Sequence, residues 1–143
     1  MKILCLVIGY FLYIAAAFAG DSSTVEISVT GFRSHIGICR CLIFHHENGF
    51  PESVQDADTA LAQPVAGDTV RFSIRLRYGT YAVSVLHDEN ANGKMDKTWY
   101  GKPVEGIGTS NNPVIKLSSP SYSAASVVID KIHSLLNIKL QYL

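Results

Sequence analysis

Residues 69–88 read TVRFSIRLRYGTYAVSVLHD, and the alternation of apolar and polar side chains in this stretch indicates two successive β-strands. One face of the first strand carries four apolar side chains, Val70, Phe72, Ile74 and Leu76. The residues between them, Arg71, Ser73 and Arg75, are expected to face water. The connection at residues 77–79 is tight, so the two strands are predicted to pair as an antiparallel hairpin.

The same period of two recurs along the chain and predicts about seven strands in all. The other strands are expected at residues 24–32, 37–45, 114–117, 125–130 and 136–143. Seven short strands in roughly 120 residues are typical of an all-β fold, an antiparallel β-sandwich with Greek-key connections. Residues 37–45 are apolar on both faces and are predicted to form a central strand. At most one short helix is expected, within residues 52–62.

Residues 1–19 are predicted to be a cleaved secretory signal peptide. Lys2 provides a positive start, residues 3–17 are almost wholly apolar, and Ala17-Phe18-Ala19 has the small-x-small cleavage pattern. An apolar run of about 15 to 18 residues is short for a bilayer span, which argues against an uncleaved anchor. Residues 20–143 are then expected to form a single exported domain, periplasmic or secreted, with no membrane insertion after cleavage.

The charge of the predicted mature chain is close to neutral. Removal of Lys2 with the signal peptide leaves 11 basic and 12 acidic residues, a formal charge of −1, and no basic patch stands out. Nucleic acid and anionic membrane surfaces are therefore poor candidate partners. A small neutral ligand, a protein of the cell envelope or a metal ion fits this composition better.

Cys39 and Cys41 are separated by one residue, and on a strand their Cα atoms would lie about 6.6 Å apart, near the upper limit for a disulfide. Both are interpreted as small core residues beside Ile43, with a strained redox pair as the alternative.

Residues 88–96, DENANGKMD, resemble the first nine positions of a calcium-binding loop. Oxygen ligands would come from alternate positions: Asp88, Asn90, Asn92, the backbone carbonyl of Lys94, and Asp96. Gly93 permits the sharp bend, and Glu89 or Glu105 could complete the shell. Trp99 stands where an EF-hand has its bidentate glutamate, so the loop is not an EF-hand, and any Ca²⁺ would bind weakly. The alternative is a polar turn closed by its own hydrogen bonds, because Asp, Asn and Gly are the residues that form turns.

This loop belongs to a longer stretch, GTYAVSVLHDENANGKMDKTWYGKPVEGIGTSNN at residues 79–112, that closely resembles the signature of the bacterial domain-of-unknown-function family numbered 2141. The matching positions are Gly79, Tyr81, Ala82, His87, Asp88, Asn90, Asn92, Gly93 and Asp96, followed by Gly101, Pro103, Glu105, Gly106, Gly108, Ser110, Asn111 and Asn112. The resemblance extends over essentially the whole mature chain. It implies an exported Ig-like or transthyretin-like sandwich and brings no established activity.

Three functional hypotheses follow. The first is an exported binding or structural module whose loop 88–96, with or without calcium, stiffens a functional edge together with residues 101–112.

The second is a hydrolase-like enzyme in which His87 works with Asp88 or Glu105 as base and orienting group. His45 and His46 could also join His87 at a transition metal, although neighbours on a strand point to opposite faces, so only one of them could take part. The third is a docking domain that uses Trp99 and Tyr100 as exposed anchors. Both residues could instead belong to the core, and Trp99 is expected there.

Overall fold

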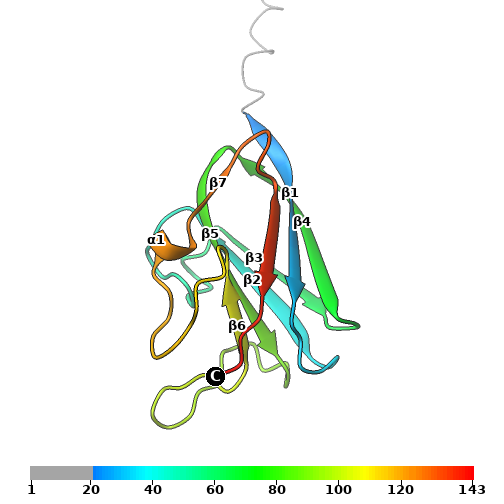
Figure 1. Ribbon diagram of the computed structural model, residues 1–143, viewed down its shortest axis with the longest axis vertical. Helices are drawn as coiled ribbons and strands as arrows, with labels where there is room; N and C mark the ends of the chain where they lie inside the picture. Colours follow the sequence, from blue (N-terminus) through cyan, green and yellow to red (C-terminus); the bar gives the residue numbers. More distant parts are fainter. Residues whose placement is uncertain (1–20) are drawn as a thin grey trace, which may run out of the picture.

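The computed structural model describes residues 21–143, which form an all-β sandwich with one short helix (Figure 1). The predicted signal peptide lies outside these residues. The strands are β1 (Ser22–Thr30), β2 (Ile38–Phe44), β3 (Thr59–Pro64), β4 (Thr69–Arg77), β5 (Gly79–Asp88), β6 (Gly106–Thr109), β7 (Val127–Ile129) and β8 (Leu135–Lys139), and the helix is α1 (Tyr122–Ala125). No helix within 21–143 is long and apolar enough to cross a membrane.

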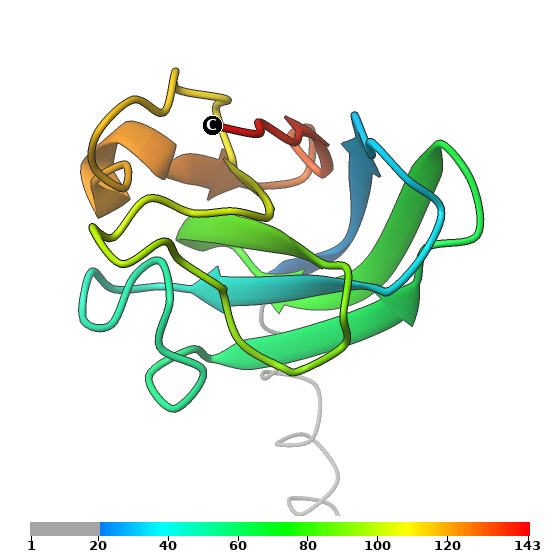
Figure 2. The ribbon, with the colours of Figure 1, turned by 90° about the horizontal axis from the view of Figure 1, so that it is seen from below.

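The strands are arranged in two sheets. One has the order β4-β1-β8, and the other has the order β3-β2-β5-β6, with β7 paired to the beginning of β5. The segment between β5 and β6 lies at the same end of the molecule as the C-terminus, as both views show (Figures 1 and 2). The prediction of an all-β sandwich is confirmed, and β2 is central in its sheet as expected. The pairing is not purely antiparallel, because β1 and β8 run parallel.

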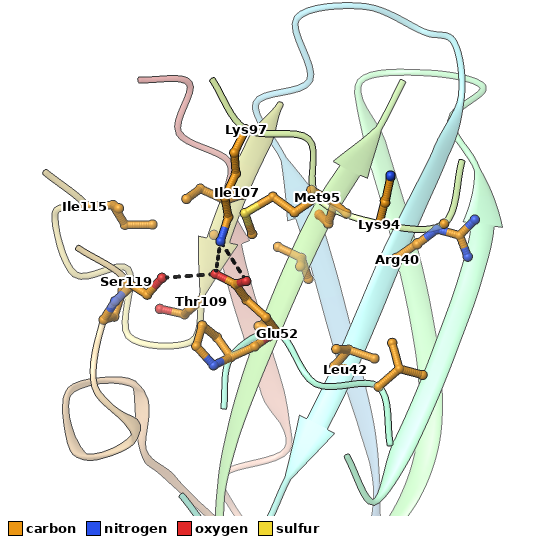
Figure 3. A pocket seen from close by; sticks show the side chains of 18 residues that line it. Arg40, Leu42, Glu52, Lys94, Met95, Lys97, Ile107, Thr109, Ile115 and Ser119 are labelled. Atoms are coloured by element: carbon orange, nitrogen blue, oxygen red, sulfur yellow. Dashed lines mark hydrogen bonds and ion pairs between the residues drawn. The ribbon is translucent and has the colours of Figure 1, made fainter. Parts of the chain in front are cut away.

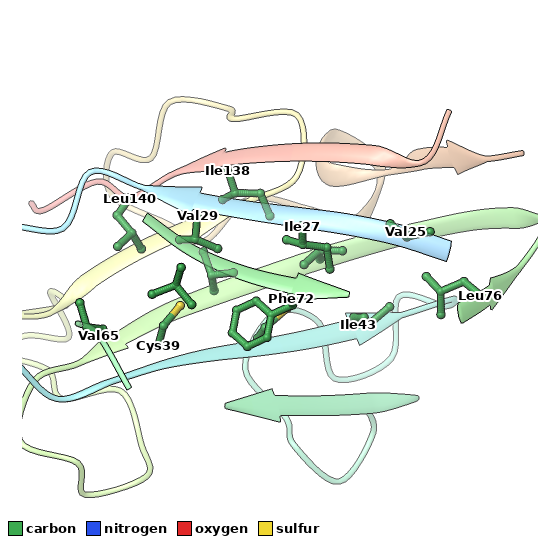
Figure 4. Packing of buried hydrophobic residues seen from close by; sticks show 14 of the residues in the cluster. Val25, Ile27, Val29, Cys39, Ile43, Val65, Phe72, Leu76, Ile138 and Leu140 are labelled. Carbon is green, nitrogen blue, oxygen red and sulfur yellow. The ribbon is translucent and has the colours of Figure 1, made fainter. Parts of the chain in front are cut away.

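Alternate side chains of both sheets point into the space between them and form one apolar core (Figure 4). The core includes Val25, Ile27, Val29, Cys39, Cys41, Ile43, Val70, Phe72, Val83, Val85 and Ile138. Cys39 and Cys41 are free and fully buried, so the prediction of core packing is confirmed. Burial raises the pKa of the Cys39 thiol to about 12, which keeps the thiolate scarce and the residue unreactive.

The predicted hairpin of residues 69–88 is wrong. β4 pairs with β1 over its whole length, whereas β5 pairs with β2 in the opposite sheet. Only Tyr78 separates the two strands, and a hairpin within one sheet commonly needs at least two loop residues. The chain therefore crosses from one sheet to the other at this point. The expected faces of β4 are nevertheless correct, since Val70 and Phe72 are buried and Arg71 is exposed.

Three local predictions are also wrong, and the structure has eight strands within 21–143 instead of seven. The expected helix at 52–62 is replaced by turns and β3, because Ser53 and Asp56 hydrogen-bond to each other locally. Residues 114–117 form no strand. The glycine-rich stretch 106–109, absent from the predicted strands, is β6. A Cβ atom at Gly106 would lie 2.5 Å from the ring of Tyr142, so close packing favours glycine there.

Candidate functional site

The outer face of the five-stranded sheet carries a cavity of about 410 Å³. Its floor is built by two rows of side chains that pair across β2, β5 and β6. The first row is Arg40, Leu86 and Ile107, and the second is Leu42, Ser84 and Thr109. These residues alternate with the core residues of the same strands, so they point away from the sandwich interior. The sheet thus buries apolar side chains on both faces.

Three loops form the walls of this cavity (Figure 3). They are residues 51–54, 93–97 and 115–120. Lys97 Nζ is 2.9 Å from Glu52 Oε2, and the Ser119 hydroxyl donates to Glu52 Oε1 at 3.5 Å. Glu52 therefore connects all three walls at the rim. A second hollow of about 530 Å³ lies beside the first and shares the Lys97–Glu52 pair with it.

Thr109 provides an unsatisfied polar group in the cavity floor. Its side chain is 3% exposed, and its Oγ1 has no hydrogen-bond partner among residues 21–143. Buried hydroxyl groups are normally hydrogen-bonded, because an unpaired one costs about 1 to 3 kcal/mol. A ligand with a polar atom at this point would satisfy Thr109.

Lys94 is the second polar feature of the cavity. The charged lining residues are Arg40, Lys94, Lys97 and Glu52. Arg40 is paired with Asp88 and Lys97 with Glu52, whereas Lys94 makes no ion pair within the described part of the chain. The cavity therefore combines an apolar floor with an uncompensated ammonium group at one side.

Loop 88–96 begins at Asp88, whose side chain is fully buried. Arg40 Nε donates to Asp88 Oδ2 at 2.6 Å, the Gly93 N–H donates to the same oxygen at 2.9 Å, and the Asn92 N–H donates to Oδ1 at 3.0 Å. Burial alone would raise the pKa of Asp88, but these three donors outweigh it, so the pKa lies below its ordinary value. The ionised Asp88 carboxylate therefore joins the loop to β2 by accepting hydrogen bonds from both.

The other predicted calcium ligands are close together on the exposed side of the loop. Asn90 Oδ1 accepts from the Asn92 N–H at 3.1 Å, and Asn92 Oδ1 accepts from the Lys94 N–H at 3.0 Å. Both side-chain amides donate to Asp96 Oδ2, at 2.7 and 2.8 Å. The loop is thus curled by its own hydrogen bonds, as the turn interpretation expects.

Glu105 closes the loop at its base. It is 4% exposed, and its Oε1 accepts from the Glu89 N–H at 3.0 Å while its Oε2 accepts from the Asp96 N–H at 3.2 Å. Gly37, just before β2, supports the same corner. A Cβ atom at Gly37 would lie 2.3 Å from the carbonyl oxygen of Asp88, and the φ of +77° also requires glycine.

The proposed catalytic residues are not arranged around one reacting position. His87 is fully buried on the core side of β5, with Nδ1 2.7 Å from the Tyr142 hydroxyl and Nε2 2.8 Å from the Ile36 carbonyl oxygen. The side chain of Asp88 points to the opposite face, and both carboxylate oxygens of Glu105 accept backbone N–H groups. These contacts give His87 a structural role in fixing the C-terminal segment.

Trp99 does not lie in the core. It is 95% exposed and packs edge-to-face against Tyr100, with ring centroids 5.2 Å apart. The expectation of a buried Trp99 is therefore wrong, because the loop that carries it extends beyond the sheets and leaves the ring almost fully exposed (Figure 1).

A family model described as "Uncharacterized protein conserved in bacteria (DUF2141)" matches residues 27–135. The chain belongs to this family. Comparison with curated proteins and with solved structures finds no match. The family resemblance noted above is confirmed, and the DUF2141 description assigns no activity.

The DUF2141 signature residues hold one corner of the fold together. In addition to the loop contacts, the buried Ser110 hydroxyl accepts from the Val83 N–H at 2.9 Å and donates to the Ala125 carbonyl. Asn111 donates to the Ser126 carbonyl at 2.6 Å, and Asn112 donates to that of Asn137 at 2.8 Å. The signature thus connects β5 and β6 to the helix and to β8.

Sequence reasoning missed the cavity and its key residues, Arg40, Thr109 and Met95. The one available signal was the apolar outer face of β2. It could not identify the loops that cover this face, because two of them, residues 93–97 and 115–120, are far from β2 in sequence.

Proposed function

We propose that this chain is an exported binding module that takes a small, largely apolar ligand in the cavity on the outer face of the five-stranded sheet. The observation that carries the proposal is the buried Thr109 hydroxyl, which lacks a partner among residues 21–143 and lies in an apolar floor. Ligand sites in proteins are typically concave, about 300 to 1,000 Å³ in volume, and mostly apolar with a few placed polar groups. Residues 1–19 support export through their signal-peptide pattern.

The polar lining residues suggest the chemistry of the ligand. Thr109 can donate or accept one hydrogen bond, and Lys94 favours a negative charge at its side of the cavity. The ligand class that matches both is an apolar molecule with one anionic or hydrogen-bonding end. Loop 88–96 contributes Gly93, Lys94 and Met95 to the wall, so its internal hydrogen bonds would keep the site preformed.

The experiment that tests this uses the fluorescent dye anilinonaphthalene sulfonate, an apolar anion, with displacement by the fatty acid decanoate. Ser84→Phe fills the floor, and Ser73→Phe makes the same change on the exposed outer face of β4. We expect Ser84→Phe to weaken dye binding more than tenfold, Ser73→Phe to leave it within twofold, and decanoate to displace the dye. The fold of each variant is checked by circular dichroism.

Thr109→Val provides a variant of nearly unchanged shape in case Ser84→Phe unfolds. It should weaken decanoate binding while the protein stays folded. Equal dye affinity in Ser84→Phe and the wild type would refute the site, and a failure of decanoate to displace the dye would refute a ligand of the fatty-acid type.

A second proposal is calcium binding by the oxygens of Asp88, Asn90, Asn92, Lys94 and Asp96. The supporting observation is the curl of the loop, in which the backbone N–H groups of residues 92–94 turn inward to the side-chain oxygens. Asp88 Oδ1, Asn90 Oδ1 and Asn92 Oδ1 each have a second lone pair for a cation. Asp88 Oδ2 does not, because it already accepts from Arg40 and Gly93. Arg40 already neutralises part of the charge of Asp88, and the ion would displace two amide donors from Asp96. Affinity should therefore be weak, with Kd on the order of 10⁻³ M.

The melting temperature across calcium from chelator to about 10 mM tests this second proposal. We expect a rise in the wild type and none in Asp96→Asn, which keeps the side-chain shape and removes the charge. Magnesium at equal ionic strength is the control. A flat response in the wild type would show that hydrogen bonds alone hold the loop.

A further inference from the structure

The two ends of loop 45–58 bring a histidine pair and an aspartate together. β2 ends at Phe44, so His45 and His46 follow the strand, and the alternation of strand side chains no longer separates them. Their imidazole rings have centroids 4.6 Å apart with planes at 67°. Asp58 comes just before β3, and its N–H donates to the Ile43 carbonyl at 2.9 Å, which closes the loop.

We infer that His45, His46 and Asp58 form a binding site for a divalent transition metal of the zinc type. One ligand atom from each residue lies within 4.8 Å of the other two. Around a tetrahedral Zn²⁺ with bonds of 2.0 to 2.2 Å, ligand atoms are about 3.3 Å apart. His45 Nδ1 and Asp58 Oδ1 are already 2.5 Å apart and would have to separate by just under about 1 Å, whereas His46 would have to approach them by up to about 1.5 Å. Side-chain rotation can supply both changes.

His46 provides a second observation that points to a ligand. Its Nδ1 is buried and has no hydrogen-bond partner within 21–143. Buried ring nitrogens normally have a partner, and this one leaves His46 without a protein contact that fixes its tautomer. The imidazole can therefore present a free lone pair to a metal, with only a small rearrangement of the surrounding polar groups.

Asp58 holds His45 in place. Its Oδ1 is 2.5 Å from His45 Nδ1, and its Oδ2 accepts from the His45 N–H at 2.6 Å. The side chains of His45 and Asp58 are 59% and 32% exposed, so an ion can reach them from solvent. To act as a ligand itself, Asp58 would exchange the contact of its Oδ1 with the His45 ring for the metal, while its Oδ2 keeps the His45 N–H.

The donor set determines which metal is expected. Two imidazoles and one carboxylate suit Zn²⁺, Ni²⁺ and Cu²⁺, whereas Ca²⁺ and Mg²⁺ require oxygen ligands. Three protein ligands leave a position for water, because closed structural zinc sites have four. The site is distinct from loop 88–96, whose side chains contact Arg40 and Glu105. His87, expected to join such a site, is buried elsewhere.

Other histidines of the chain offer a matched control. His35 Nε2 is 2.7 Å from Asp68 Oδ1 on the surface, so this pair has the same chemistry as His45 and Asp58 without a second imidazole. Metal binding that depends on the three-residue cluster should not change when His35 is replaced. Binding by scattered surface histidines would depend on His35 as much as on His46.

The test is isothermal titration of the full chain, prepared without a histidine tag, with zinc chloride and separately with calcium chloride. We expect one Zn²⁺ site. His46→Ala and Asp58→Asn should each weaken it at least tenfold, and His35→Ala should leave it unchanged. The absorption spectrum of the Co²⁺ complex should show bands of a nitrogen- and oxygen-ligated ion, lost in His46→Ala. Because Asp58→Asn also disturbs the turn, His46→Ala decides the outcome if that variant is unstable.

The absence of saturable Zn²⁺ binding up to about 100 μM, two orders of magnitude weaker than a micromolar site, would overturn the inference. Equal losses in His35→Ala and His46→Ala would also overturn it.

Discussion

Arg40→Met tests whether the buried Asp88 carboxylate needs its cation. The variant removes the guanidinium group and keeps most of the aliphatic length. Asp88 would retain two backbone N–H donors, from Asn92 and Gly93, and would lose its one opposite charge. We expect a substantial loss of stability, because an ionised carboxylate would remain in a place that water does not reach.

The magnitude follows from the burial of the two partners. Breaking a fully buried ion pair costs about 3 to 5 kcal/mol. The Arg40 side chain is 30% exposed, so solvent already screens part of the interaction and the expected loss falls to about 2 to 3 kcal/mol. Total stabilities are typically about 5 to 15 kcal/mol, so the variant should fold with a clearly lower transition midpoint.

The stability difference between the wild type and Arg40→Met should also depend on pH, in a direction set by the pKa of Asp88. In the wild type the pKa of Asp88 is below its ordinary value, so Asp88 contributes stability above the unfolded-state pKa of about 3.9, and this contribution disappears as the pH falls through the lower folded-state pKa. In Arg40→Met, burial dominates and raises the pKa of Asp88, so protonation at mildly acidic pH relieves the unpaired charge. The difference between the two proteins should therefore be largest at neutral pH and smaller near about pH 4.5.

Urea unfolding at both pH values measures this difference, with Arg71→Met as the control. Arg71 is exposed on β4, and the change there should cost less than about 0.5 kcal/mol. A loss of unfolding free energy below about 1 kcal/mol for Arg40→Met at neutral pH, or an equal loss at both pH values, would refute the claim that buried Asp88 depends on its ion pair with Arg40.

Three further variants test individual contacts by the same unfolding measurement. Gly37→Ala places a methyl group 2.3 Å from a backbone carbonyl oxygen at a φ of +77° and should cost more than about 2 kcal/mol; Gly67→Ala, with no atom within 4 Å, should be close to neutral. Thr109→Val removes the unpartnered hydroxyl and should stabilise the free protein by about 1 kcal/mol, so a clear loss would mean that the hydroxyl has a partner. Tyr142→Phe deprives His87 Nδ1 of its partner and should cost about 1 to 2 kcal/mol; no change would show that this contact adds nothing.

Much of the local structure could be predicted from the sequence. Side chains alternate along a strand because of backbone geometry, so the buried face of β4 and the core positions of Cys39 and Cys41 follow from spacing alone. The turn at residues 88–93 could also be predicted, because the Asp88 side chain accepts hydrogen bonds from the backbone of Asn92 and Gly93, only a few residues ahead.

The tertiary structure decided the partners of these elements. No local pattern shows that β4 and β5 belong to different sheets, because strand pairing depends on contacts between distant segments. The strand at glycine-rich β6 and the exposure of Trp99 were not predicted, for the same reason. Residue type gives only an average preference for a strand or for burial, whereas contacts with neighbouring segments determine the secondary structure and exposure of each residue.

The sequence by itself determined six of the eight strands in residues 21–143, their inward faces and the family. The cation beside Asp88, the cavity over β2, β5 and β6, and the cluster of His45, His46 and Asp58 exist only in the folded chain. Arg40 lies 48 residues before Asp88, and Asp58 lies 13 residues after His45. Sheet pairing and loop closure bring these charges and ligands together, and these are non-local events that the periodicity of a single strand does not encode.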